Sequence, residues 1–203
     1  SASSASASIH SQGGTTTVSG QVKARDRIEL FGKEVNVLPG GKVETTESGG
    51  DLYLRAEQTA HLSGASIYIA GEIHAQDVLH LYADELRVNG LVQQNSSDGR
   101  LLLNSASELL ISGVDGQVKA EGDIEANAGV DKEWTESTLL GNISVDDLSA
   151  GTITIQGAGL IEGQADVTLQ AGDDVVIQAT TGEGEDRKLK SPYIVQTDHT
   201  YSV

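Results

Sequence analysis

The feature that most constrains the fold is a loose repeat of short alternating segments that begins at Gly20. The tetrapeptide Gln-Val-Lys-Ala occurs twice without change, starting at Gln21 and at Gln117, and Glu72-Ile-His-Ala is a variant of it. A second alternating segment follows each copy after an acidic or glycine-containing corner, as in Arg27-Ile-Glu-Leu-Phe-Gly. Alternation with a period of two residues is typical of β-strands. The repeat therefore predicts many short strands of one kind, each ended by glycine or another small residue.

The spacing of these strands indicates a solenoid. Aligning the segments places equivalent positions, with steps of 21, 30, 19 and 26 residues, at Val22, Val43, Ile73, Val92 and Val118. An irregular period of this length, punctuated by glycine, predicts stacked coils with loop insertions. Residues 130–140, around Trp134, carry the one helical pattern. A sandwich of short strands is the alternative, but the exact repeat favours an all-β, parallel β-helix.

Composition divides the chain into three parts. Residues 20–180 carry the repeat and are the predicted β-helix. Residues 1–19 open with the Ser/Ala-rich SASSASAS, which fits a linker or a strand laid against another subunit. Residues 181–203 are expected to form a loop and strand that cover the last coil or contact a neighbour.

The charge and residue content exclude several classes of function. The net charge of −17 disfavours binding to nucleic acid, which requires clustered Lys and Arg. The chain has no Cys, which excludes disulfides and thiol chemistry. No apolar run approaches the roughly 18 residues of a membrane helix, so no membrane insertion is expected.

Alternation within the strands assigns side chains to the inside and the outside. The inward positions are Ile28, Leu30, Leu52, Leu54, Leu79, Leu81, Leu101 and Leu103. The same register stacks Glu29, Tyr53, His80 and Leu102 in one outward column, and Phe31, Arg55, Tyr82 and Asn104 in the next. Because Phe31, Tyr53, Tyr82 and Leu102 make these columns unusually apolar, we expect a contact face for a subunit or ligand, or the floor under a loop. Scattered surface aromatics are the plainer interpretation.

Several phrases of the repeat resemble those of a known family. Gly50-Asp-Leu-Tyr-Leu-Arg-Ala, Gly122-Asp-Ile-Glu-Ala-Asn-Ala-Gly and the stretch from Ala165 to Ala179 are similar to filamentous-haemagglutinin-type repeats of large exported bacterial adhesins. The resemblance covers residues 20–179. It implies a right-handed parallel β-helix that is extracellular, lies at the cell surface and acts in attachment.

Paired carboxylates are the one feature that points to catalysis. Asp146-Asp147 and Asp173-Asp174 are adjacent pairs, and β-helix polysaccharide hydrolases and lyases use acidic residues as acid, base or calcium ligand. Neighbouring residues of a strand point to opposite faces, so a sequence pair alone makes no catalytic dyad. We therefore predict no catalytic residue and no enzyme, with a β-helix polysaccharide lyase or hydrolase as the alternative.

Acidic turns and histidines raise the question of metal binding. The turns are Asp98-Gly99, Asp115-Gly116 and residues 183–186, and none matches a known calcium loop. We name no metal or cofactor site, although weakly bound calcium is compatible with these turns. His74 and His80 lie on opposite sides of a corner and are expected to be surface residues.

Two Asn-x-Ser sequons complete the candidate sites. They begin at Asn95 and Asn142 and would carry glycans on surface loops in a glycosylating cell.

These observations favour a non-enzymatic structural subunit or segment of an extracellular fibre or adhesin. Its expected partners are further copies of itself, or neighbouring repeats of a longer chain, because uncovered terminal coils expose strand edges. A second alternative is a glycan-binding adhesive module in which Tyr53 and Tyr82 act as stacking platforms for a host or surface glycan.

Overall fold

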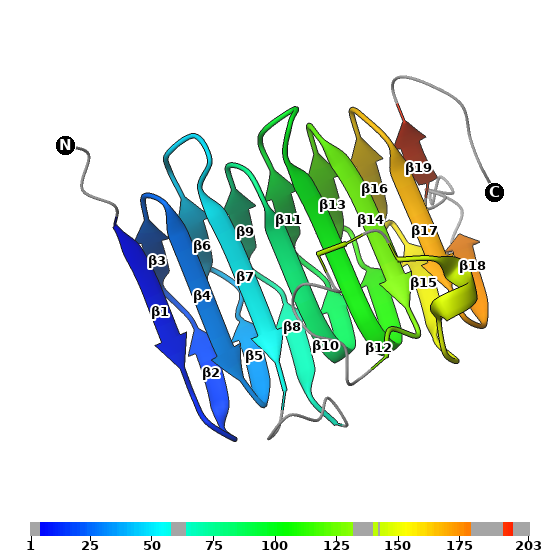
Figure 1. Ribbon diagram of the computed structural model, residues 1–203, viewed down its shortest axis with the longest axis horizontal. Helices are drawn as coiled ribbons and strands as arrows, with labels where there is room; N and C mark the ends of the chain where they lie inside the picture. The colour runs from blue at the N-terminus through cyan, green and yellow to red at the C-terminus, as the bar shows by residue number, and fades with distance from the viewer. Residues whose placement is uncertain (1–4, 58–63, 132–139, 142, 180–192, 197–203) are drawn as a thin grey trace, which may run out of the picture.

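The computed structural model describes residues 5–57, 64–131, 140–141, 143–179 and 193–196. Its strands stack in parallel to form a β-solenoid of about seven turns (Figure 1). The predicted all-β parallel solenoid is therefore confirmed. The described residues contain no α-helix, and their one helical turn is the 3-10 helix η1 (Val145–Asp147). The helical pattern predicted around Trp134 lies largely outside the described residues.

Each turn of the solenoid contributes a strand to each of three faces, which we call A, B and C. Face A consists of β1 (Ser6–His10), β4 (Arg27–Gly32), β7 (Asp51–Ala56), the first half of β10 (Leu79–Val88), the first half of β12 (Arg100–Ser112), β14 (Asp123–Ala128) and β17 (Val167–Ala171).

Face B continues the same sheet around a corner. It consists of β2 (Thr15–Val18), β5 (Glu34–Val37), β8 (Ser66–Ile69), the second halves of β10 and β12, β15 (Thr152–Gly157) and β18 (Asp174–Ala179). The strands β10 and β12 run through the corner without interruption, and a register shift between Ala83 and Glu85 bends them there.

Face C is a separate sheet of seven strands. It consists of β3 (Gln21–Ala24), β6 (Lys42–Thr45), β9 (Glu72–Ala75), β11 (Leu91–Gln94), β13 (Gln117–Ala120), β16 (Leu160–Gly163) and β19 (Tyr193–Gln196). The pairing stacks Val22, Val43, Ile73, Val92 and Val118 in one row. The coil positions predicted from the sequence are thus confirmed.

Aliphatic ladders fill the interior. The eight predicted inward residues, from Ile28 to Leu103, are all at most 1% exposed. On face A they continue through Ile124 and Ala126, which are also fully buried. Stacking like side chains at each level buries apolar area along the whole axis, and this burial is the main favourable contribution to folding.

Glycine marks the corner between faces B and C. Six glycines occupy equivalent places there: Gly20, Gly41, Gly71, Gly90, Gly116 and Gly159. From the second coil on, the N–H after the corner donates to a glycine carbonyl of the preceding coil, as Glu72 does to Gly41 at 2.9 Å. A Cβ atom on Gly71 or Gly90 would strike a carbonyl oxygen of that preceding coil. The close stacking of the corners therefore requires glycine.

The solenoid extends further than the repeat in the sequence. Strand β1 pairs with β4 and β2 pairs with β5, so residues 6–18 pack on their own chain. At the other end, β19 pairs with β16 and lies within the last coil. The Ser/Ala-rich start can join the stack because the ladder is made by backbone groups and needs few apolar side chains.

Candidate functional surfaces

The outer surface of face A carries the two predicted columns of side chains. Pairing aligns Glu29, Tyr53, His80 and Leu102 in the Tyr53 column, and Phe31, Arg55, Tyr82 and Asn104 in the Tyr82 column. The register of both columns therefore agrees with the sequence analysis. Their surroundings divide face A into a covered part and an uncovered part.

The covered part lies beneath described residues of an insertion between β14 and β15, among them Val130, Ile143 and Leu148. Tyr82 and Leu102 are each only 1% exposed, and Tyr82 packs with Ala106, Val130 and Ile143. The Tyr82 hydroxyl donates to the carbonyl of Asp131 at 3.3 Å. Two of the four residues named for a contact face, Tyr82 and Leu102, are therefore the floor under a loop. Tyr82 is not available as a platform for a glycan.

A polar ladder runs beneath the same insertion. The side-chain amide of Asn127 donates to Asn104 Oδ1 at 2.9 Å, and Asn104 Nδ2 donates to His80 Nε2 at 3.1 Å. His80, Asn104 and Asn127 are at most 4% exposed. His80 was expected on the surface, but it is buried among Tyr53, Tyr82 and Asn104. Asn104 has an outward place in the Tyr82 column, and the one sequence feature that indicates its role is Asn127 at the equivalent position of the next coil.

Burial shifts the pKa values of two side chains in the covered part of face A, His80 and Tyr82. Loss of solvent, with smaller contributions from Arg55 and Arg100, lowers the pKa of His80 to about 3. The ring is therefore neutral at physiological pH, which agrees with its acceptance of a hydrogen bond from Asn104. Burial also raises the pKa of the Tyr82 hydroxyl above its usual range.

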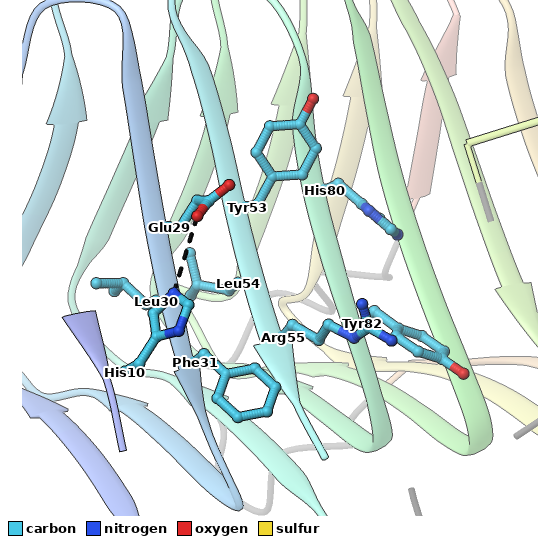
Figure 2. Close-up of a pocket in the computed structure, with 9 residues that line it drawn as sticks. All are labelled: His10, Glu29, Leu30, Phe31, Tyr53, Leu54, Arg55, His80 and Tyr82. Carbon is cyan, nitrogen blue, oxygen red and sulfur yellow. Dashed lines mark ion pairs between the residues drawn. The ribbon is translucent and has the colours of Figure 1, made fainter. Parts of the chain in front are cut away.

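The uncovered part of face A contains a groove between the two columns. It has a volume of about 170 Å³, and its lining comprises His10, Glu29, Leu30, Phe31, Tyr53, Leu54, Arg55, His80 and Tyr82. Figure 2 shows Phe31 beside His10 at one end and Arg55 extended towards Tyr82 at the other. Phe31 and Tyr53 are partly exposed, so they remain candidates for contact.

Rings and ion pairs hold the walls of the groove. His10 and Phe31 lie with ring centroids 5.5 Å apart, and the Arg27 guanidinium stacks on Tyr53 at 4.3 Å. Arg27 donates to Glu29 at 2.7 Å, and Arg55 donates to Glu57 at 2.9 Å. Arg27 and Arg55 are thus each paired with a carboxylate two residues further along the chain.

The structure separates the other sequence candidates. Asp146 and Asp147 lie exposed in η1, whereas Asp173 and Asp174 lie exposed at the corner that leads from face A to face B. His74 lies on face C within 3.1 Å of Glu72, well apart from His80 on face A. Asn95 follows β11 and accepts a hydrogen bond from Gln93, but Asn142 lies outside the described residues.

Acidic turns are likewise distributed over several corners. Asp98 and Asp115 are exposed, and residues 183–186 lie outside the described part of the chain. Burial, with the nearby carboxylates of Asp51 and Asp98, raises the pKa of Asp77. Within the described ranges, no three His, Asp or Glu side chains are placed to hold a metal ion.

The two ends of the stack form the second candidate surface. Strands β1, β2 and β3 each pair on one side only, and so do β17, β18 and β19 at the opposite end (Figure 1). Three large apolar side chains of these terminal coils are exposed: Ile9, Val175 and Ile177, at 40, 42 and 48%. A Cβ atom on Gly20, the corner glycine of the first coil, would meet nothing within 4 Å. The described coils thus end, on both sides of the stack, in strands that pair on one side only.

Comparison with known proteins identifies no relative. No family model, curated protein or solved structure matches this chain. Among the described residues there is also no helix with the length and apolar character needed to cross a membrane.

Proposed function

We propose that this chain is a non-enzymatic structural unit of an extracellular, cell-surface fibre or adhesin, and that it assembles by stacking its coil ends. The filamentous-haemagglutinin-type phrases of the repeat support the setting. The observation that carries the proposal is that, among the described strands, three at each end of the stack pair on one side only. Parallel strand addition can continue the ladder from the last coil of one copy to the first coil of the next.

The stack has a direction. At the corner between faces B and C, the N–H after the corner donates to a glycine carbonyl of the preceding coil, so a head-to-tail contact would turn the corresponding N–H of the first coil towards the next copy. Lys23 and Arg25 of the first coil are ion-paired with Glu44 and Glu47 of the second coil, and residues 164–179 carry three aspartates and no base. These ion pairs offset charge within one copy, so stacking must overcome the repulsion expected between bodies of net charge −17.

Head-to-tail stacking makes a specific prediction for variants of each end. Ile177→Asp places a charge in the apolar edge of the last coil, and Gly20→Ala places a methyl group where the next copy would approach. We expect the wild-type chain to form filaments in electron microscopy and each variant to sediment as a monomer. Val114→Asp, which alters a side chain 68% exposed in a middle coil, is the matched control and should still form filaments.

Mixing the two variants tests the polarity of the contact. Each variant keeps one intact end, so an equimolar mixture should form 1:1 dimers and nothing longer. A wild-type chain that stays monomeric at all concentrations would overturn self-assembly. Filaments that persist in both variants would place the contact elsewhere.

A further inference from the structure

The groove on face A has the shape of a trough along the solenoid axis. Its walls are the Tyr53 and Tyr82 columns, whose side chains are two residues apart on each strand and hence about 7 Å apart. Its volume of about 170 Å³ is below the roughly 300 Å³ at which small-molecule pockets begin. The trough therefore accepts a single ring laid against the sheet.

The charges of the lining exclude an ionic ligand. Arg55 is paired with Glu57 and Arg27 with Glu29, while His10 lies 3.8 Å from the same Glu29. An anion would have to displace a carboxylate from a guanidinium, and a cation would have to displace a guanidinium from a carboxylate. A neutral ligand can bind without breaking either of these ion pairs.

The remaining surface combines aromatic faces with planar polar groups. Phe31 and Tyr53 present apolar rings, and Glu29 and Arg55 present oxygen and N–H groups beside them (Figure 2). A ligand that matches this lining has one apolar face and a rim of hydroxyl groups.

We propose that the trough binds a neutral pyranose ring of a glycan. The C–H face of the sugar packs on Phe31 beside the Tyr53 ring, on which Arg27 stacks, and its hydroxyl groups bond with the Glu29 carboxylate and the Arg55 guanidinium. The buried Tyr82 is the neighbour of Arg55 in the same column, with the guanidinium 5.7 Å from the centroid of its ring. This site would give the adhesin function proposed above a ligand class, and its biological setting rests on that proposed function.

Saturation-transfer NMR on the Ile177→Asp chain tests the site without interference from assembly. The probes are the methyl glycosides of glucose, galactose, mannose and N-acetylglucosamine, with methyl glucuronide as the acidic comparison. We expect at least one neutral glycoside to bind, and Phe31→Ala to weaken it roughly tenfold, the value of one aromatic contact. Tyr53→Phe keeps the ring and should keep binding.

Tyr68→Ala is the matched control, because Tyr68 is an outward tyrosine on face B. It should leave binding unchanged. Thermal melts establish that each variant is folded, and Phe31→Leu replaces Phe31→Ala if the latter unfolds.

The proposal is overturned if no neutral glycoside binds, if loss of the Phe31 ring leaves affinity unchanged, or if the glucuronide binds best. The NMR experiment uses a chain that is expected not to assemble. A negative glycan-binding result would therefore leave the stacking proposal standing, and a negative assembly result would leave the glycan proposal standing.

Discussion

At the scale of single residues, His80 shows how position within the stack decides chemistry. It occupies an outward place on β10, yet it is only 4% exposed and Asn104 donates to its ring. Its neighbours in the Tyr53 column, Glu29 and Tyr53, are partly exposed. The same column therefore changes from surface to interior within one coil.

Burial of neutral His80 predicts a pH-dependent stability. Its pKa is about 3 in the folded chain and about 6.5 when unfolded, so the unfolded chain binds more protons between these values. The free energy of unfolding should fall as pH drops from 6.5 towards 3, by roughly 1 kcal/mol per pH unit in mid-range. Urea titrations of wild type and His80→Gln should show that the variant lacks this component.

His10→Gln serves as the control, because the His10 side chain is 58% exposed. It should follow the wild-type profile. Equal pH slopes for wild type and His80→Gln would contradict the burial of a neutral ring.

At the scale of strands, each coil protects the inward side chains of its neighbours. Ile155 on β15 and Ile177 on β18 are paired in one inward row on face B, with Ile111 on the other side of Ile155. Ile155 is fully buried, whereas Ile177 is 48% exposed because no described coil follows it. The same residue type in the same row thus has two environments.

This pair predicts a contrast in stability. In the monomer, Ile155→Ala should lower the free energy of unfolding by about 2–5 kcal/mol, because it opens a cavity between packed coils. Ile177→Ala should cost less than about 1 kcal/mol, because its side chain already contacts water. Urea unfolding at low protein concentration measures both, and equal costs would show that the last coil is covered.

At the scale of the whole molecule, the stack behaves as a one-dimensional array. Each coil contacts its immediate neighbours, so stability is a sum of coil and interface contributions. The middle coils have two interfaces and the terminal coils have one. Opening is therefore expected to begin at the ends.

Hydrogen exchange should map this gradient. In the non-assembling Ile177→Asp chain, we expect the slowest exchange in β9, β11 and β13, and the fastest in β3 and β18. In the assembled wild-type chain, amides of β3 and β18 should become protected, since stacking would give both terminal coils a second interface. Uniform protection along the monomer would contradict the array, and unchanged terminal exchange on assembly would contradict end-to-end stacking.

The sequence by itself determined the coils, the inward ladders and the register of the outward columns. It could do so because each is a local property: alternation assigns sides, glycine marks corners and the repeat sets equivalent positions, so Ile28, Leu52 and Leu79 could be aligned by inspection. The sequence did not predict that residues 6–18 pair with the next coil of the same chain, because Ser and Ala are weak indicators of a strand.

Only the tertiary structure decided which part of face A is open. The insertion after β14 reaches back across the stack, where Asp131 accepts from Tyr82 and Leu140 accepts from Arg100, partners 49 and 40 residues apart in the chain. Such contacts have no period and leave no pattern in the sequence. Tyr53 and Tyr82 are therefore the same residue type with the same outward register, but Tyr53 is partly exposed and Tyr82 is buried, because a distant loop packs on Tyr82.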